Sequence, residues 1–349
     1  MDKHSFYLQF ASDNYAGVCP EALEYLNKAN EGFDYPYGED RWTKEACDMF
    51  RDLFETDCEV FFVYNGTSAN ALALASVCQS YHSIISHELA HIETDECGAV
   101  EFFANGAKLL LGKGENGKLS PASVADIITR RCDIHYAKPQ AISITQSTEV
   151  GTVYTSDEIL NLYKVSKRHN LRFHMDGARL ANAIAALKVT PKEITWQCGI
   201  DVLCFGGVKN GLMFGETVIF FDKELAHEFA YRCKQGGQLS SKMRFIASQW
   251  VGLLKNNVWL NNARHANACA KELYEALRNI EEVQILFPCE ANAVFVQLPP
   301  SALDALRKKG WHFYTFIGAG GARFMCSWKT TPEAVKQLSE DVKEAVRKK

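Results

Sequence analysis

The sequence lacks several features that mark whole classes of protein. It has no long run of charge of one sign, and its formal net charge of -4 with a pI near 6.2 gives no reason to expect binding to nucleic acid or to an anionic membrane. Its twelve cysteines form no C-x-x-C pair and show no metal-ligand spacing, so we expect reduced thiols, no metal site and a cytoplasmic protein. The N-terminal residues also lack the apolar core of a signal peptide. A small-molecule partner is therefore the default expectation.

Charge is also absent from one long stretch, residues 60–86, which contains no Asp, Glu, Lys or Arg. Such a stretch resembles a membrane span in composition, but Asn65-Gly-Thr-Ser68 interrupts it with residues typical of turns. We therefore interpret it as a buried strand followed by a buried helix, and we expect no membrane partner.

Short apolar runs alternate with segments of helical period between about residues 58 and 220, which is typical of an α/β domain with a mostly parallel central sheet. A capping box, Thr155-Ser-Asp-Glu158, opens the helix between the second and third runs. The runs that we expect to be strands are 60–64, 141–145, 171–175, 202–205 and 217–221.

The pattern changes after about residue 235, where a long helical region leads to apolar runs at 293–298 and 322–326 and to a last amphipathic helix from near Thr330. This predicts a smaller C-terminal α+β domain. The boundaries that we expect are an N-terminal arm over residues 1–18, a large domain over 19–240 and the C-terminal domain over 241–349.

A lysine and an aspartate follow two of the expected strands. Lys209 lies among the glycines of Gly206-Gly-Val-Lys-Asn-Gly211, and Asp176 lies in His174-Met-Asp-Gly-Ala-Arg179. Ligands of open α/β sheets bind at the carboxyl ends of the strands. Pyridoxal 5'-phosphate needs both groups, because a lysine forms a Schiff base with its aldehyde and a carboxylate keeps its pyridine nitrogen protonated. Singly, each residue has an ordinary reading: a solvated lysine, or an aspartate that caps a helix.

Two neighbouring motifs add to this interpretation. Gly66, Thr67 and Ser68 follow a strand and open a helix, so free backbone N–H groups could hold a phosphate there, although the same turn could merely cap the helix. Arg179 could bind the cofactor's phenolate oxygen or a substrate carboxylate, or form a structural ion pair. The segment around Lys209 lacks the spacing of a nucleotide-binding P-loop.

Two histidines are candidates for proton transfer. His91 and His135 could each be an ordinary structural histidine. Beside a pyridoxal ring, an imidazole stacked on the ring face or reaching a substrate hydroxyl could take a proton as a carbon–carbon bond breaks.

Seven motifs follow one another along the chain: Ser12-Asp-Asn14, Pro36-Tyr-Gly-Glu-Asp40, Gly66-Thr-Ser-Ala-Asn70, Ala90-His-Ile92, Asp133-Ile-His135, His174-Met-Asp-Gly-Ala-Arg179 and the Lys209 segment. Taken in order, they closely resemble those of the threonine aldolases, over about residue 8 to Trp328. The segments near 146–154 and 235–244 are similar to the low-specificity L-threonine aldolase branch.

The resemblance implies the aminotransferase-like fold of pyridoxal phosphate enzymes (fold type I) and retro-aldol cleavage of L-threonine, L-allo-threonine and other β-hydroxy amino acids to glycine and an aldehyde. It also implies a homotetramer, a dimer of dimers whose active sites draw on both chains. The implied catalytic residues are Lys209 as the Schiff-base lysine, Asp176 as the pyridinium partner, His91 as the ring-stacking residue and His135 near the substrate hydroxyl. The other implied site residues are Gly66, Thr67 and Ser68 for the phosphate, Ser12, Arg179 and Arg323 for the cofactor oxygen or the substrate carboxylate, and Tyr37, Arg232 and Lys234 in a neighbouring chain's site.

The sequence departs from the family pattern at two places. Val208 stands where many relatives carry a hydroxyl residue, and Gln146-Ser-Thr-Glu149 stands where many carry Glu-Asn-Thr-His. These departures concern the phosphate contacts and the stereochemical preference at Cβ. Two other functions stay open at this point: another pyridoxal phosphate lyase or aminotransferase on the same fold, and a noncatalytic protein that binds a phosphate ligand.

Overall fold

The computed structural model describes residues 8–317 and 321–347. The first seven residues of the expected N-terminal arm lie outside this range. The helices are α1 Pro20–Ala29, α2 Arg41–Phe54, α3 Gly66–Val77, α4 His91–Thr94, α5 Ala99–Phe103, α6 Pro121–Thr129, α7 Ser156–Arg168, α8 Leu180–Leu187, α9 Phe229–Gln235, α10 Arg244–Leu254, α11 Val258–Leu277, α12 Pro300–Lys308 and α13 Pro332–Arg347. Among the described residues, none of these helices is long and apolar enough to cross a bilayer.

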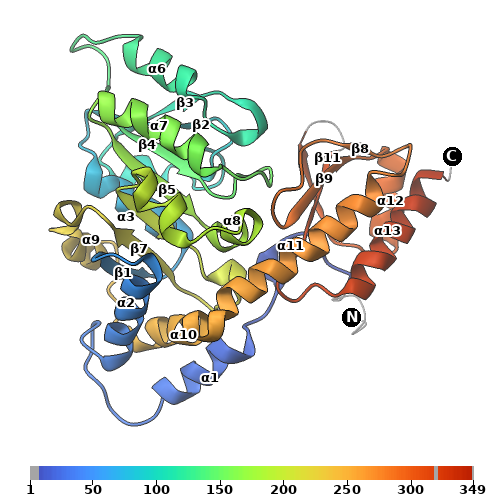
Figure 1. Cartoon of the computed structure of the whole chain (residues 1–349), viewed down its shortest axis with the longest axis horizontal. Helices are drawn as coiled ribbons and strands as arrows, with labels where there is room; N and C mark the ends of the chain where they lie inside the picture. The colour runs from blue at the N-terminus through green and yellow to red at the C-terminus, as the bar shows by residue number, and fades with distance from the viewer. Residues whose placement is uncertain (1–7, 318–320, 348–349) are drawn as a thin grey trace.

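The larger domain is built on a seven-stranded sheet (Figure 1) with the strand order β1-β7-β6-β5-β4-β2-β3. Only β7 runs against its neighbours, so the expected mostly parallel sheet is confirmed. All five expected strands are present; β2 and β3 complete the sheet. The strands are β1 Glu59–Val63, β2 His82–His87, β3 Lys108–Gly112, β4 Lys138–Thr145, β5 Arg172–Gly177, β6 Val202–Phe205 and β7 Glu216–Phe220.

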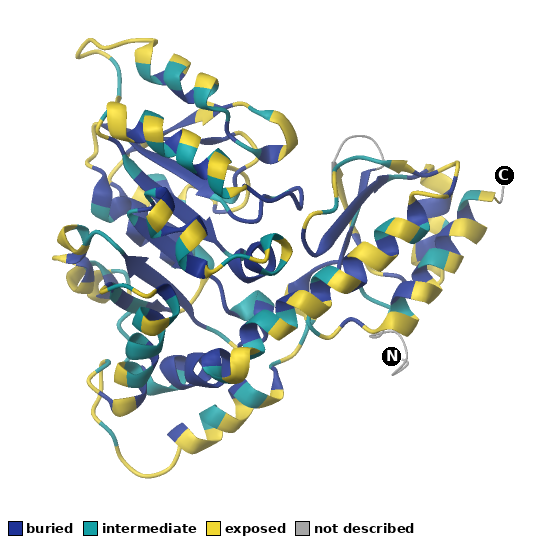
Figure 2. Ribbon diagram, in the orientation of Figure 1, coloured by how far each residue is buried: buried dark blue, intermediate teal, exposed yellow. Residues whose placement is uncertain are grey.

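Helices cover both faces of this sheet, which is why its strands are apolar almost throughout. One face packs against α2, α6, α7, α8 and α10, whose apolar side chains form the largest buried cluster. The other face packs against α3, α5 and α9. Figure 2 shows the strands buried between these helices. The charge-free stretch is a buried strand and a buried helix, as expected, and continues into β2.

The smaller domain contains a four-stranded antiparallel sheet with the order β10-β11-β9-β8. Its core includes residues of α11, α12 and α13. These strands are β8 Gln284–Ile285, β9 Ala293–Gln297, β10 Tyr314–Ile317 and β11 Gly321–Met325.

The boundary between the two cores lies later than residue 241. The core of the large domain includes α10 and reaches Ala263, whereas the core of the small domain begins along α11 at Cys269. The sequence pattern could not locate this point, because α11 is one continuous helix that contributes to both cores (Figure 1). The described part of the N-terminal arm joins the small domain, where Phe10 packs against Trp311.

The carboxyl ends of β1, β2, β4, β5 and β6 meet at one edge of the large sheet. At this edge Gly206, just after β6, lies against Ala178, just after β5; a Cβ on Gly206 would be 2.5 Å from the Ala178 carbonyl oxygen. A side chain there would force the two strand ends apart. The close approach brings the segments that carry Asp176 and Lys209 together at the position where ligands bind in such sheets.

Phe50 of α2 is an aromatic anchor of the large core. It is fully buried against Phe62, Phe205 and Trp250. We expect Phe50→Ala to lower the free energy of unfolding by about 3–5 kcal/mol, because it leaves a cavity among rings that cannot collapse onto it. Denaturant titration followed by tryptophan fluorescence measures this, with Trp250 as a nearby reporter. The matched control is Phe102→Ala, which changes an exposed side chain of α5, with an expected loss well under about 1 kcal/mol; equal losses in the two variants would contradict the prediction.

Candidate active site

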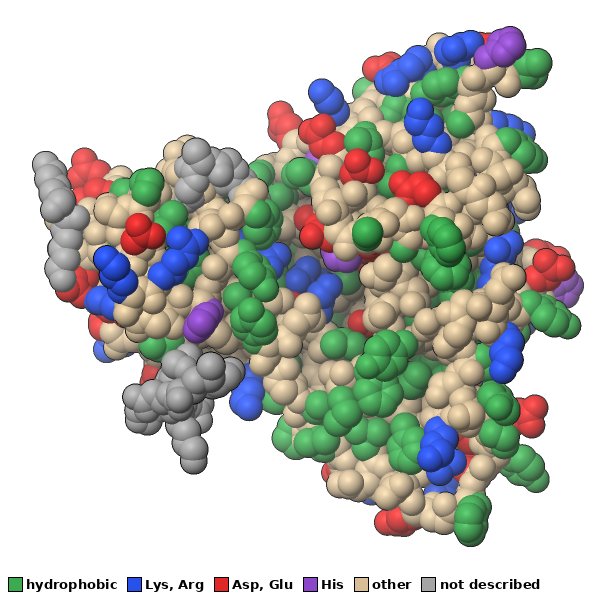
Figure 3. All heavy atoms as spheres, turned by 180° about the vertical axis from the view of Figure 1, so that it is seen from behind, with side chains coloured by type: hydrophobic (Ala, Val, Ile, Leu, Met, Phe, Trp, Pro, Cys, Tyr) green, Lys and Arg blue, Asp and Glu red, His purple; other side chains and the backbone are tan. Residues whose placement is uncertain are grey.

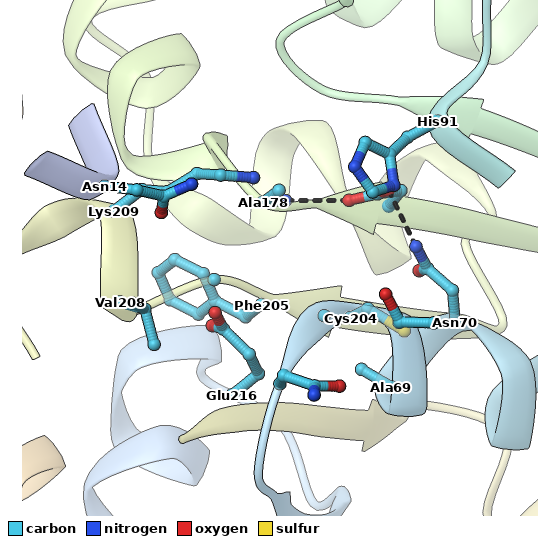
Figure 4. Close-up of a pocket in the computed structure, with 15 residues that line it drawn as sticks. Asn14, Ala69, Asn70, His91, Ala178, Cys204, Phe205, Val208, Lys209 and Glu216 are labelled. Atoms are coloured by element: carbon cyan, nitrogen blue, oxygen red, sulfur yellow. Dashed lines mark hydrogen bonds between the residues drawn. The ribbon is translucent and has the colours of Figure 1, made fainter. Parts of the chain in front are cut away.

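Lys209 lies in a short 3-10 turn, η6 (Val208–Asn210), which follows β6 after two glycines. The turn is held by Glu216 of β7, whose buried carboxylate accepts a hydrogen bond from the Gly207 N–H. Burial of the amine and the nearby Arg179 guanidinium lower the pKa of Lys209. A lowered pKa increases the fraction of neutral amine, which is the nucleophilic form. In Figure 4, Lys209 extends across a cavity of about 220 Å³ toward His91.

Asp176 faces the same cavity from the end of β5 and is nearly fully buried. Its Oδ2 accepts a hydrogen bond of 2.8 Å from Asn70 Nδ2, and its Oδ1 accepts one of 2.9 Å from the Ala178 N–H. Figure 4 draws both bonds. These two donors fix the direction in which the carboxylate points. The hydrogen bond from the Ala178 N–H agrees with the interpretation of Asp176 as a helix cap. The hydrogen bond from Asn70 is not part of a helix cap.

His91 begins α4 and contributes its ring to the cavity wall. Its Nδ1 lies 2.8 Å from Glu96 Oε1, and its backbone N–H donates to Glu149 Oε1 at 2.8 Å. The hydrogen bond to Glu96 raises the pKa of His91. Burial raises the pKa of Glu149 to about 7. Glu149 belongs to the segment where the sequence departs from its relatives, so this departure supplies a contact to the backbone of His91.

The N-terminus of α3 forms another wall of the cavity. The cap is Asn65, whose side chain accepts from the Ser68 N–H at 2.9 Å, rather than Thr67 or Ser68 themselves. The first N–H groups of a helix have no partner within the helix. Gly66 and Thr67, which line the cavity, therefore offer their amides to an anion there, whereas the Ser68 amide is already bonded.

Arg179 forms a bidentate ion pair with Asp13, with Nε–Oδ2 and Nη2–Oδ1 distances of 2.7 and 2.9 Å. This is the structural ion pair that was open at the sequence level. It lies next to the cavity, since Asn14, which follows Asp13, lines the cavity wall. Burial raises the pKa of Asp13, but the Arg179 charge and hydrogen bond outweigh it, so the net shift is downward.

Arg323 of β11 donates to the Ala11 carbonyl at 3.0 Å, and burial together with Arg179 lowers its pKa to about 10. Ser12 is buried beside Asp13 and caps the turn that carries Asn14 to the cavity wall.

The structure does not bring His135 to this cavity within one chain. His135 is exposed in the turn before β4, and β4 runs from there across the sheet to Thr145, which pairs with Asp176. It therefore lies at the opposite edge of the sheet, about 20 Å away for a strand of this length. Strand direction alone could have revealed this, because a residue before a parallel strand cannot lie at the strand's carboxyl end. A role for His135 beside Lys209 stays a prediction that requires another chain.

Tyr37, Arg232 and Lys234 form no part of the cavity wall either. Tyr37 is half exposed, and the Lys234 ammonium lies 5.1 Å from the centroid of its ring. Arg232 lies with Lys234 in α9. The three residues thus gather near the surface, which is compatible with their expected place in a neighbouring chain's site.

The expectation of no metal site included the statement that the histidines form no H-E-x-x-H pattern, and that statement was wrong: His87-Glu-Leu-Ala-His91 has this spacing. Two histidines four apart on one helix can bind zinc. In the structure β2 ends at His87 and α4 begins at His91, so the two rings do not share a helix face. His87 Nε2 is bonded instead to the Gly114 carbonyl oxygen at 3.2 Å. The spacing therefore does not produce the zinc geometry.

Several residues of the site were missed at the sequence level. Asn70 lay within a motif that carries the resemblance, but nothing in a single sequence links it to Asp176, 106 positions away. Asn14, Glu96 and Glu216 also contact the cavity or the residues that line it. A polar residue inside an apolar helix was the one available signal, and Asn70 in α3 is such a residue.

Comparison with known proteins agrees with this geometry. The model of a family described as beta-eliminating lyase matches residues 9–299. Low specificity L-threonine aldolases from Pseudomonas sp. (strain NCIMB 10558) and Pseudomonas aeruginosa are each 58% identical over 335 residues, which cover 96% of this chain and 97% of each relative.

Solved structures agree as well. A threonine aldolase of Leishmania major superposes with a TM-score of 0.91 at 28% identity, covering 97% of this chain and 99% of that one. The methionine aminotransferase YbdL of Escherichia coli, at 12% identity and a TM-score of 0.74 over 97% of this chain and 93% of that one, shares the fold alone. The resemblance and the aminotransferase-like fold are thereby confirmed, and the chain belongs to the beta-eliminating lyase family and, within it, to the low-specificity L-threonine aldolases.

Proposed function

We propose that this protein is a carbon–carbon lyase that cleaves L-threonine, L-allo-threonine and other β-hydroxy amino acids to glycine and the corresponding aldehyde, with pyridoxal 5'-phosphate as its cofactor. The observation that carries the proposal is the convergence of Lys209 and Asp176 on one cavity beside the free N-terminal amides of α3. The 58% identity to two low specificity L-threonine aldolases supports the choice of reaction.

The residues around the cavity fit this cofactor. Gly66 and Thr67 of α3 would hold its phosphate, Asp176 would face its ring nitrogen and Lys209 would bind its aldehyde carbon. A Cβ at Gly206 would clash with Ala178, so glycine at this position lets the segment that carries Lys209 lie close to the segment that carries Asp176. When bound, the cofactor supplies an electrophilic aldehyde and a ring that accepts the electron pair of the bond that breaks.

The protein's own groups divide the remaining work. Asp176, fixed by Asn70 and Ala178, would present its carboxylate to the ring nitrogen, where a negative charge favours a proton. Arg323 would bind the substrate carboxylate, since its Nε is buried and has no hydrogen-bond partner among the described residues. Arg179, already paired with Asp13, adds positive charge beside the same place.

Proton transfer would begin at the substrate hydroxyl. A base takes the hydroxyl proton, the O–H electrons form the aldehyde C=O bond, and the Cα–Cβ pair stays with the Cα side, where a later proton gives glycine. His91 lines the cavity and, among the described residues of one chain, is the imidazole in its wall. When the protein binds the substrate's carboxylate and its hydroxyl at the same time, the orientation of the Cα–Cβ bond is fixed. This orientation selects that bond for cleavage.

Exposed apolar residues support an oligomer. Five large apolar or aromatic side chains are about half exposed or more: Phe33, Tyr35, Tyr37, Tyr64 and Met213. Figure 3 shows a broad apolar patch on the face of the molecule that is seen from behind. Tyr64 directly precedes Asn65 at the cavity wall. Such patches mark interaction sites, so we propose a homotetramer, built from dimers, in which this surface packs near the active site of the partner chain.

Light scattering tests the assembly. We expect a molar mass of four copies of the 39.1 kDa chain. Phe33→Asp should yield smaller species, because it introduces a charge into the apolar surface, and Phe102→Asp on α5 should not. A monomeric wild-type protein, or equal effects of the two changes, would contradict the proposal.

Product analysis tests the reaction. Incubation with L-threonine or L-allo-threonine should release glycine and acetaldehyde in equal amounts without any added keto acid. An aminotransferase would need a keto acid and would release no acetaldehyde. Absence of acetaldehyde from both substrates, in protein that carries the cofactor, would refute the proposed function.

Borohydride trapping tests the lysine. Reduction of the purified holoprotein should fix the cofactor on Lys209, as read by peptide mass spectrometry, and Lys209→Ala should lose both the modified peptide and turnover by more than about 1000-fold. Asp176→Asn is the contrasting variant, since it keeps the lysine and should keep the modified peptide while turnover falls about 100-fold or more. A label on another lysine, or near-normal turnover of Asp176→Asn, would contradict these roles.

A further inference from the structure

The ring of His91 is held by a buried carboxylate that no part of the proposed reaction yet uses. Glu96 lies between α4 and α5, is 3% exposed, and its Oε1 lies 2.8 Å from His91 Nδ1. Its Oε2 has no hydrogen-bond partner among the described residues. Burying a carboxylate costs free energy unless the group is paired. The partners of Glu96 therefore indicate its role.

Those partners connect Glu96 to the rest of the site. The Asn70 Nδ2 group donates one hydrogen bond of 2.8 Å to Glu96 Oε1 and another of 2.8 Å to Asp176 Oδ2. One ring nitrogen of His91 and one carboxylate oxygen each of Glu96 and Asp176 lie within 4.8 Å of one another. One amide thus fixes Glu96 relative to Asp176, and the Glu149 contact to the His91 N–H fixes the backbone that carries the ring.

The direction of the hydrogen bond to His91 has a chemical consequence. Burial raises the pKa of Glu96, and its hydrogen bonds with His91 and Asn70 act in the opposite direction. When Glu96 is ionised it can only accept, so His91 Nδ1 then carries the proton. In the neutral ring the lone pair is then on Nε2, which makes no hydrogen bond to any residue that the structure describes. The ring lines the cavity, so Nε2 is the nitrogen left to a substrate.

We propose that Glu96 is a positioning residue that holds His91 as the Nδ1–H tautomer, so that Nε2 accepts the proton from the substrate's β-hydroxyl. This rests on the proposed aldolase function. The O–H bond breaks, its proton moves to the Nε2 lone pair, and the oxygen keeps the electrons that form the aldehyde. The positive imidazolium that results is stabilised by the Glu96 carboxylate.

Burial and three titratable groups set the direction of the His91 pKa shift. The Glu96 hydrogen bond and the Asp176 charge raise the pKa of the ring, whereas burial and the Lys209 charge lower it; the net direction is upward. Glu149 faces the His91 backbone N–H. Since a base must be neutral, activity should rise with pH through the raised pKa of His91, and loss of the Glu96 charge should shift that rise to lower pH.

The test uses NMR of ¹⁵N-histidine-labelled protein without cofactor, so its readout does not depend on aldolase activity. The His91 signals are assigned by their loss in His91→Asn. In the wild type we expect the Nδ1–H tautomer and titration above the ordinary histidine range. Glu96→Gln keeps an acceptor without the charge and should lower the titration midpoint by about one pH unit or more; Glu96→Ala should mix the two tautomers.

The matched control is Glu93→Gln, which removes an exposed carboxylate from α4 and should change neither signal. In the holoenzyme, the acid limb of kcat/KM for L-allo-threonine should move with the NMR midpoint in Glu96→Gln. A wild-type ring in the Nε2–H tautomer, an unchanged midpoint in Glu96→Gln, or an acid limb that does not move would overturn the proposal. Should Glu96→Ala fail to fold, Glu96→Gln alone decides. Correct tautomer and midpoints with no acetaldehyde from any substrate would refute the aldolase function and leave the His91 geometry standing.

Discussion

The side-chain amide of Asn70 lets two buried carboxylates share one corner of the cavity. Without its two N–H donors, Glu96 and Asp176 would face each other at close range with repelling charges and unmet acceptors. With them, Asp176 is fixed toward the cavity and Glu96 toward His91. The helix that carries Asn70 also presents its N-terminal amides to the cavity, so one apolar helix sets both the anion site and the carboxylate pair.

Charge balance explains why a lysine with a lowered pKa can persist here. Lys209 is near Asp13, Asp176 and Glu216, but Asp13 is engaged by Arg179, and Asp176 by Asn70 and Ala178. Burial raises the pKa of Glu216 to about 7, and its carboxylate accepts from the Gly207 N–H. Burial and the Arg179 charge outweigh the attraction of these three acids, so the pKa of Lys209 is lowered.

Much of the fold followed from the sequence, because apolar runs and caps act locally. Lys209, Asp176 and the α3 turn could be placed together since all follow parallel strands, whose carboxyl ends share an edge. The same rule, applied to His135 before β4, would have separated it from the cavity. The Asn70–Asp176 and Arg179–Asp13 pairs could not be predicted, because they join residues 106 and 166 positions apart and depend on side-chain directions. The boundary within α11 escaped detection for a different reason: the helix pattern is uninterrupted where the core changes.

Residues 146–149, where the sequence departs from the expected family pattern, support the site through two side chains. Gln146 makes two hydrogen bonds with the backbone of Tyr154, which closes the loop, and Glu149 within the loop accepts from the His91 N–H. A histidine at position 149 would be a second imidazole in the site; the carboxylate instead anchors the first. His91 is then held at its backbone by Glu149 and at its ring by Glu96. Two separate acids converge on one histidine, so the position of that ring is what this part of the chain is built to fix.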